Sequence, residues 1–367
     1  MILIYFYILE KVGIFLKPQL KSLQVYSAGL SDEALKRKTG YEGEFSRLAS
    51  NENPIGPTPK VKEMLAKSLT GLNYYPDPEA NALKEKLSAF YDVPAEQIFV
   101  GAGLDEVIMS ISRAVLVPEG DVLTSEGTFV QYATHALIEG THLKTVPLKD
   151  GYFDLDAMAE AITDNTNIIW ICNPNNPTGT YVTETELRTF LSKVPQSITV
   201  VLDEAYFEFV DAKDYPDGVK LLKEFPNLII LRTFSKAYGL AAMRVGYAMT
   251  SKAYVSEFNK VKLPFNVTTL SLLAAITALE DQAHLKKYVA LNKAQREQLF
   301  AKPYSKHFLP SQTNFIFIKT NQPQALFDTF IQHGVISRPM PIGVRVTIGQ
   351  IEDNKKIDAA LTAFFGE

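Results

Sequence analysis

Short runs of apolar residues alternate with amphipathic helical patterns over most of the chain. Several of these runs are apolar at every position, which is typical of parallel strands covered on both faces. The alternation predicts an α/β fold with right-handed crossovers, in which helices cover both faces of a mostly parallel sheet to make three layers. We expect strands at 98–100, 168–172, 198–202, 228–231 and 245–249, and helices at 184–191 and 219–224.

The pattern changes after about residue 280, where a long charged helix is expected at 282–300. Strands at 314–319 and 344–348, with a helical stretch between them, are typical of a smaller α+β domain. The first sixteen residues are strongly apolar but too short to cross a bilayer, so no membrane segment is expected. We therefore predict a large domain over 48–280, a small domain made of 17–47 and 281–367, and an apolar N-terminal arm over 1–16.

The composition excludes several classes of function. Of the 367 residues, 46% are apolar and 21% are charged, which suits a globular protein with ample core. The net charge of −4 offers no electrostatic footprint for nucleic acid. The single cysteine, Cys172, excludes internal disulfides and fits a reducing compartment, so a cytoplasmic location is expected. No metal site is expected.

Lys236 is the most informative residue, because the apolar strand 228–231 runs almost directly into it. Two hydroxyls, Thr233 and Ser235, precede it, and Arg244 follows eight positions later. The hydroxyls and the guanidinium would bind a phosphate. The ammonium form of Lys236 would be disfavoured beside that cationic site, which is how a lysine becomes a nucleophile able to form a Schiff base.

Three other expected strands end in residues with suitable chemistry. Strand 98–100 leads into GAGLDE and a helix, whose first N–H groups could bind a phosphate; Glu106 stands where a dinucleotide fingerprint requires glycine. Strand 168–172 leads into NPNNPTG, a rigid turn that could hold an amide against a ligand. Strand 198–202 leads into Asp203, which could pair with a protonated ring nitrogen. As alternatives, Asp105 or Asp203 could simply cap a helix.

An aldehyde-binding lysine, a carboxylate for a ring nitrogen, a phosphate cradle and a polar amide are together the components of a pyridoxal phosphate site. Seven motifs extend this pattern: SNENPIGP (50–57), YPDPEANALKEKL (75–87), GAGLDE (101–106), NPNNPTG (173–179), DEAY (203–206), TFSKAYGLAAMRVGY (233–247) and VRVTIG (344–349). With these motifs the sequence resembles the fold-type I pyridoxal phosphate aminotransferases from about residue 48 onward. It is most similar to their histidinol-phosphate aminotransferase branch.

The resemblance implies a role for each candidate residue. Lys236 would carry the internal aldimine and later move a proton between Cα and C4′, while Asp203 would hold the pyridine nitrogen protonated. Asn176 and Tyr206 would hydrogen-bond the phenolate oxygen of the ring. The other cofactor contacts would come from Phe129, which stacks on the ring, and, at the phosphate, from Leu104, Asp105, Ser235 and Arg244.

The resemblance also implies substrates and a partner subunit. Arg345 and Arg338, with Asn176 nearby, would bind the substrates L-histidinol phosphate and glutamate or 2-oxoglutarate, in histidine biosynthesis. The planar fork of arginine suits both carboxylate and phosphate. Tyr75 matches a tyrosine that reaches the phosphate of the other subunit, which implies a homodimer with shared active sites.

Some positions depart from the family pattern and leave alternatives open. Ile55 stands where the family usually has tyrosine, and a further tyrosine expected at the substrate would be Tyr26 or Tyr41. Aromatic-amino-acid transamination and threonine-phosphate decarboxylation are the nearest rival activities. A pyridoxal phosphate-binding regulator would need a DNA-binding domain, which neither the residues before 48 nor the charge supports. A nucleotide-binding module would leave Lys236 and Asp203 without a task.

Overall fold

A seven-stranded sheet forms the larger part of the computed structural model, which describes residues 16–23 and 32–366. Its strand order is β2-β8-β7-β6-β5-β3-β4, and only β8 runs antiparallel to its neighbours. The strands are β2 (Ile98–Gly101), β3 (Asp121–Ser125), β4 (His142–Val146), β5 (Thr166–Cys172), β6 (Thr199–Asp203), β7 (Leu228–Thr233) and β8 (Gly246–Met249).

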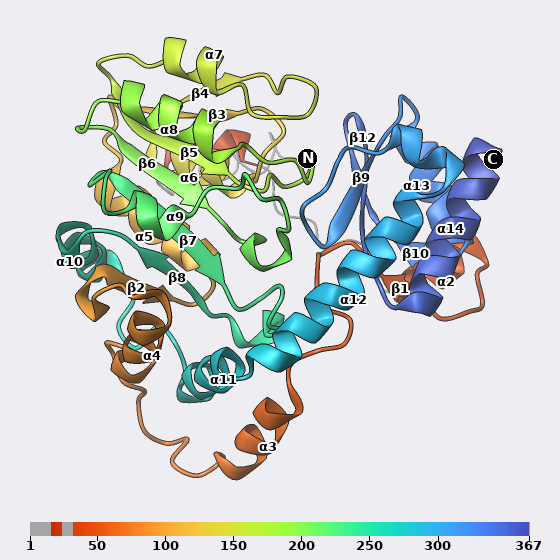
Figure 1. Ribbon diagram of the computed structural model, residues 1–367, viewed down its shortest axis with the longest axis horizontal. Coiled ribbons are helices and arrows are strands. Elements are labelled where there is room, and N and C mark those ends of the chain that lie inside the picture. Colours follow the sequence, from red (N-terminus) through yellow and green to blue (C-terminus); the bar gives the residue numbers. More distant parts are fainter. Residues whose placement is uncertain (1–15, 24–31, 367) are drawn as a thin grey trace.

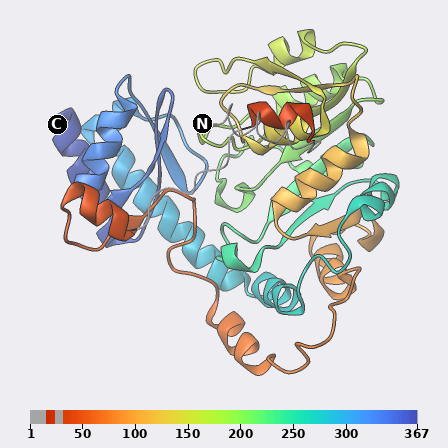
Figure 2. The ribbon, with the colours of Figure 1, turned by 180° about the vertical axis from the view of Figure 1, so that it is seen from behind.

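Helices cover both faces of this sheet, so the predicted three-layer α/β fold is confirmed. The helices α8 (Glu184–Lys193) and α9 (Gly218–Leu221) lie in front of the sheet in Figure 1. On the opposite face, seen in Figure 2, lies α5 (Leu104–Val115). The other helices of this part are α3 (Pro59–Lys67), α4 (Asn81–Tyr91), α6 (Gln131–Glu139), α7 (Leu155–Glu160), α10 (Lys252–Val261) and α11 (Thr269–Glu280).

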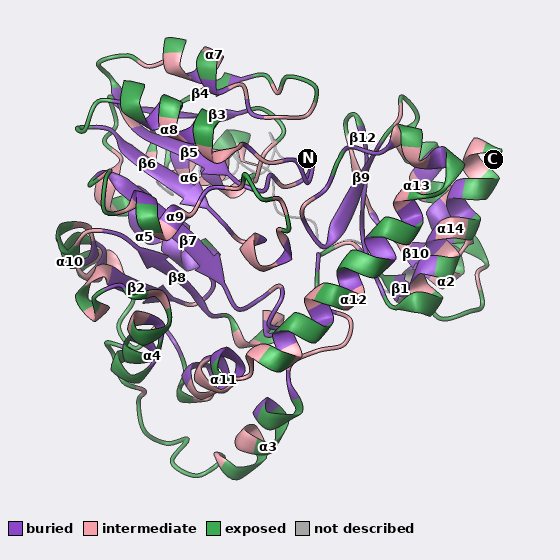
Figure 3. Ribbon diagram, in the orientation of Figure 1, coloured by how far each residue is buried: buried purple, intermediate pink, exposed green. Residues whose placement is uncertain are grey.

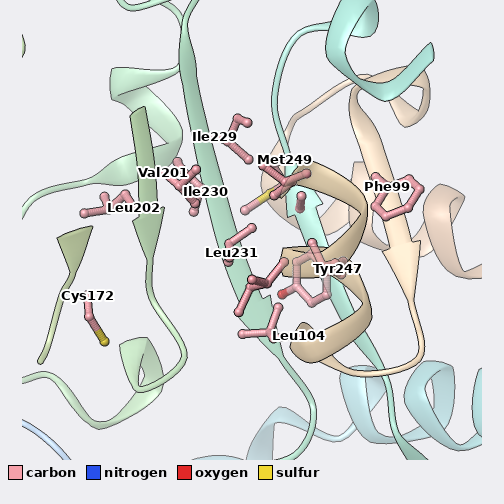
Figure 4. Packing of buried hydrophobic residues seen from close by; sticks show 14 of the residues in the cluster. Phe99, Leu104, Cys172, Val201, Leu202, Ile229, Ile230, Leu231, Tyr247 and Met249 are labelled. Atoms are coloured by element: carbon pink, nitrogen blue, oxygen red, sulfur yellow. The ribbon is translucent and has the colours of Figure 1, made fainter. Parts of the chain in front are cut away.

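The central strands are buried along their whole length, as Figure 3 shows. In β6 and β7, Val201, Leu202, Ile230 and Leu231 have no exposed surface and pack between the helical layers (Figure 4). This double burial explains why these segments are apolar at nearly every position. Strand β8 is also buried at every position, but it runs antiparallel to β2 and β7, which the sequence did not indicate.

A smaller unit follows along the chain and holds a separate apolar cluster. Its three-stranded antiparallel sheet has the order β11-β12-β9, and a short parallel pair joins β1 to β10. Helix α12 (Gln282–Phe300) runs from the large unit to this smaller one (Figure 1). The remaining elements are β1 (Ser46–Arg47), β9 (Phe315–Lys319), α13 (Pro323–Gln332), β10 (Val335–Ile336), β11 (Arg338–Met340), β12 (Gly343–Thr347), α14 (Ile351–Phe365) and α2 (Asp32–Thr39).

The N-terminal part of the described chain contacts both units. The 3-10 helix η1 (Pro18–Ser22) lies against α6, where Lys17 Nζ and Gln19 Nε2 donate to the carbonyl of Ile138 at 3.0 and 3.2 Å. Residues 46–47 instead pair with β10 of the small unit. The proposed division into 48–280 and 17–47 plus 281–367 stays a prediction, and residues 1–15 lie outside the described part. None of the described helices is long and apolar enough to cross a membrane.

Candidate active site

A cavity of about 520 Å³ lies beyond the carboxyl ends of β5, β6 and β7 and extends to the small sheet. Parallel strands bring their carboxyl ends to one edge, which is where ligands bind in open α/β sheets. Four cationic side chains and two carboxylates line this cavity, so it favours anionic ligands. The predicted site residues found in its wall are Leu104, Asp105, Phe129, Asn176, Asp203, Tyr206, Ser235, Lys236, Arg244, Arg338 and Arg345.

Lys236 follows the end of β7 and extends into the cavity, where its Nζ donates to the carbonyl of Ser50 at 2.9 Å. Desolvation by the surrounding wall, together with the charges of Arg345 and Arg244, lowers the pKa of Lys236 to about 8. The uncharged form of this amine is therefore far more populated near neutral pH than that of an ordinary lysine, as a nucleophile requires.

Arg244 defines one end of the cavity. Its backbone is left-handed, with φ of +50°, an uncommon conformation for arginine that occurs at functional sites. The guanidinium donates to Ser235 Oγ and pairs with Asp105 Oδ2, both at 3.3 Å. Gly103 has a left-handed backbone, and a Cβ there would collide with the Arg244 guanidinium, so glycine is needed for this approach to the first turn of α5. Guanidinium, hydroxyl and helix N-terminus together fit a phosphate.

The possibility that Asp105 caps α5 is wrong. The N-cap residue is Gly103, and Asp105 belongs to the first turn, from which its carboxylate reaches Arg244. An acidic side chain in the first turn is compatible with the helix dipole, so the sequence did not distinguish a cap from a partner for arginine.

Asp203 ends β6 and is 2% exposed. Its Oδ1 accepts from the Ala205 N–H at 3.0 Å and its Oδ2 from the Tyr132 hydroxyl at 2.7 Å. Burial raises the pKa of Asp203 to about 6, although both hydrogen bonds act to lower it. The carboxylate is therefore mainly ionised above neutral pH and can pair with a buried cation.

Tyr132 supports the site through Asp203 and was not predicted from the sequence. It lies on α6 three residues after Phe129, and its ring stacks on Trp170 with centroids 4.6 Å apart. Phe129 lies just before α6, and its ring contacts that of Tyr132 with centroids 5.6 Å apart, so a second aromatic close behind the predicted stacking residue was the available signal. Because Tyr132 is fully buried and donates to Asp203, it orients that carboxylate.

Arg345 joins the small sheet to the large unit. It lies on β12 directly opposite Arg338 on β11. One of its guanidinium nitrogens donates to Asn176 Oδ1 and the other to the carbonyl of Ala49. The two arginines, which the small sheet contributes, make a second cationic end of the cavity, whereas Lys236 and Arg244 belong to the large unit.

Tyr206 is buried in the cavity wall, and this burial raises its pKa to about 12, so the phenol keeps its proton. Its oxygen accepts from Asn51 Nδ2 at 2.8 Å. Asn51 also lines the cavity and belongs to the SNENPIGP motif, although no role for it was predicted from the sequence.

Two tyrosines considered in the sequence lie away from the cavity. Tyr75 is 82% exposed and stacks on Phe265 with centroids 4.4 Å apart. Tyr41 packs against Phe45 at 4.9 Å and does not line the cavity. Tyr26 is outside the described residues.

Comparison with known proteins shows which family has this arrangement. Residues 44–364 match the family described as aminotransferase class I and II. The chain belongs to this aminotransferase family. The predicted resemblance is therefore confirmed, and with it the prediction of a pyridoxal phosphate-dependent aminotransferase.

Individual relatives of this aminotransferase are similar over nearly their whole length. A histidinol-phosphate aminotransferase of Macrococcus caseolyticus is 65% identical over 350 residues, which cover 95% of this chain and 100% of that protein. A histidinol-phosphate aminotransferase of Staphylococcus aureus is 50% identical, and the match covers 95% of this chain and 99% of that protein. A similar solved structure is that of histidinol-phosphate aminotransferase from Sinorhizobium meliloti in complex with pyridoxal-5'-phosphate. It has a TM-score of 0.86 at 29% identity, and the match covers 96% of this chain and 98% of that one.

Proposed function

We propose that this aminotransferase transfers an amino group between L-histidinol phosphate and 2-oxoglutarate in histidine biosynthesis, in the cytoplasm. The observation that carries the proposal is the second cationic end of the cavity, where Arg338 and Arg345 lie opposite each other on adjacent strands. The first cationic end, at Arg244, serves the phosphate of the cofactor. The second one is then available for the anionic group of each substrate in turn. The high identity to histidinol-phosphate aminotransferases supports this assignment.

The side chains of the cavity provide what pyridoxal phosphate needs. When bound, this cofactor supplies a ring that accepts electrons from the substrate carbon. Lys236 holds the cofactor through Nζ and later takes the proton from the substrate carbon. Asp203 keeps a proton on the ring nitrogen, and Tyr206 and Asn176 hydrogen-bond the ring oxygen. The phosphate is bound by Ser235, Arg244 and the first N–H groups of α5, and Phe129 stacks on the ring.

Histidinol phosphate and glutamate differ in the anion that they present. Histidinol phosphate has no carboxylate, so its phosphate occupies the place of a glutamate carboxylate. Arginine accommodates both, because its fork of N–H donors matches the oxygens of either anion. The same two guanidiniums therefore serve both halves of the reaction.

Steady-state rates with different amino donors test the substrate. With 2-oxoglutarate as acceptor, histidinol phosphate should exceed histidinol in kcat/KM by at least about tenfold, since one charge-assisted contact contributes about 1.5–3 kcal/mol. Phenylalanine and tyrosine should be poorer donors than histidinol phosphate. If free histidinol equals its phosphate ester while phenylalanine reacts well, the protein is instead an aromatic aminotransferase.

Two arginine variants, a test variant at the site and a control variant at the surface, examine whether both substrates use the same cation. In Arg345→Ala, kcat/KM should fall for both histidinol phosphate and glutamate, because both anions lose the same cation. Arg188, which pairs with Glu224 at the surface at 2.6 Å, is the control position, and Arg188→Ala should leave both rates unchanged. A variant at 345 that affected only one substrate would contradict a shared anion site.

A homodimer with shared active sites also belongs to the proposal. Tyr74 and Tyr75 are 75% and 82% exposed, and Leu69 and Leu72 nearby are each 60% exposed. Large apolar side chains exposed together in one segment, 69–75, are typical of an interface. Because Tyr75 is absent from the cavity of its own chain, it would complete the phosphate site of a partner subunit.

Mixing two impaired variants tests this sharing. A heterodimer of a Lys236→Ala chain and a Tyr75→Phe chain contains one unmutated site only if Tyr75 acts across the interface. We expect the refolded mixture to be more active than either variant alone. Activity equal to the average of the two homodimers would show that Tyr75 serves its own chain.

A further inference from the structure

Asn51 connects Tyr206 to the small sheet through a closed set of hydrogen bonds. Asn51 is 1% exposed and has a left-handed backbone, with φ of +57°. Its side chain contacts Tyr206 Oη at 2.8 Å through Nδ2 and Thr347 Oγ1 at 3.1 Å through Oδ1. Its backbone N–H donates to the same Thr347 oxygen at 3.0 Å, and its carbonyl accepts from Asn314 Nδ2 at 3.0 Å. Both main chain and side chain of Asn51 are therefore held in place.

These contacts determine which way the amide of Asn51 points. The backbone N–H of Asn51 can only donate, so Thr347 Oγ1 is its acceptor. The single hydroxyl proton of Thr347 is then directed to Asn51 Oδ1, which leaves Nδ2 facing Tyr206. The reverse orientation would place the NH₂ group against Thr347 and deprive this buried hydroxyl of its acceptor. Leaving such a buried donor unsatisfied is unfavourable.

The orientation of the amide in turn determines the direction of the Tyr206 proton. Because Asn51 Nδ2 donates to Tyr206 Oη, the hydroxyl proton of Tyr206 must point to another acceptor. Tyr206 lines the cavity, and the high pKa that follows from its burial keeps the proton on the phenol. The proton is thus available to a ligand in the cavity.

We propose that Asn51 and Thr347 are positioning residues that make Tyr206 an obligatory hydrogen-bond donor to the bound cofactor. This inference rests on the proposed function, in which the acceptor is the ring oxygen of pyridoxal phosphate. Thr347 lies two residues after Arg345 on β12. The strand that carries the substrate-binding arginine therefore also sets the proton direction at the cofactor.

Asn51→Asp reverses the network with almost no change of shape. An aspartate tolerates the left-handed conformation but has no donor. One of its oxygens would still accept from Thr347, while the other would accept the Tyr206 proton and withdraw it from the cavity. The ring oxygen of bound pyridoxal phosphate would then hold its shared proton more tightly. We expect the pH midpoint of the visible absorbance of the holoenzyme to rise by about one to two units, the scale of one hydrogen bond to a charged group.

Thr347 provides an uncharged version of the same test. Thr347→Val removes the hydroxyl that orients the amide, so the midpoint should rise in the same direction by a smaller amount. Thr347→Ser keeps the hydroxyl and should retain the wild-type midpoint. Thermal melting of each variant shows whether it folds. If Asn51→Asp fails to fold, the two Thr347 variants still test the inference.

A double-mutant cycle separates proton direction from the added charge of an aspartate. In the Tyr206→Phe background there is no proton to redirect, so Asn51→Asp should cause only the smaller shift that its added charge produces. An equal shift in both backgrounds, or an unchanged midpoint in Asn51→Asp and Thr347→Val, would overturn the inference. Equilibrium titration of the cofactor-free wild-type protein with pyridoxal phosphate is the separate readout. Absence of binding there would contradict the proposed function itself.

Discussion

Replacement of Lys236 by alanine is expected to abolish amino-group transfer while leaving a folded protein. Proton transfer by a positioned side chain contributes up to about 10⁴-fold, and the variant also loses the group that holds the cofactor, so we expect a loss of at least about 10⁴-fold. The side chain makes one hydrogen bond to a backbone carbonyl at the open cavity, so its removal should not unfold the chain.

Chemical trapping identifies the lysine directly. Borohydride reduction of the wild-type holoenzyme should attach the cofactor to the peptide that contains Lys236. Lys220, which pairs with Asp217 at the surface at 2.9 Å, is the control, and Lys220→Ala should trap cofactor as the wild type does. Cofactor recovered on another lysine peptide would remove Lys236 from its assigned role.

The pH dependence of cofactor capture follows from the environment of Lys236. Its pKa is lowered to about 8 by desolvation and by the charges of Arg345 and Arg244. Only the uncharged amine attacks an aldehyde, so capture by the cofactor-free protein should accelerate as pH rises through about 8 and then level off. Arg345→Ala removes a nearby positive charge and should move this midpoint upward. A midpoint at the ordinary lysine value would contradict the argument.

Much of the site was predictable because its residues follow strands directly in the sequence. Asp203 and Lys236 come at or just after apolar strands, and parallel strands bring such positions to one edge. The antiparallel direction of β8 was not predictable, because an apolar run has the same pattern in either direction. The role of Asp105 was left open between a helix cap and a site residue, since both roles place a carboxylate close to the start of a helix.

The residues that were missed act through contacts between distant parts of the chain. Asn51 and Thr347 are 296 positions apart, and their contact exists only once the small sheet packs against the segment before α3. Tyr132 reaches Asp203, 71 positions away, because α6 stacks it on Trp170 of β5. Nothing in local periodicity reports such pairings, so the orientation of side chains that support a site has to come from the structure.

Asp203→Ala is expected to retain weak binding of pyridoxal phosphate but to lose at least about 100-fold in kcat. In its proposed role the carboxylate stabilises the protonated ring nitrogen, and loss of one preorganised electrostatic contact has effects of about 10² to 10³. Arg244 and Ser235, which line the cavity and are proposed to bind the phosphate, remain, which is why binding should persist. Asp156→Ala is the control, because this surface carboxylate pairs only with Lys193 among its described ion pairs, at 2.8 Å.

Tyr132→Phe should weaken the binding of pyridoxal phosphate at low pH but not at high pH. The hydroxyl of Tyr132 lowers the pKa of Asp203 against the effect of burial, so its loss raises that pKa further above about 6. As pH falls toward that raised value the carboxylate becomes neutral and no longer pairs with the ring nitrogen, whereas at high pH it stays ionised. Affinity for pyridoxal phosphate, measured by equilibrium titration, should therefore decline at a higher pH than in the wild type. If Asp203→Ala turns over at a near-normal rate, Asp203 has no electronic role, and the pH profile of Tyr132→Phe should then match that of the wild type.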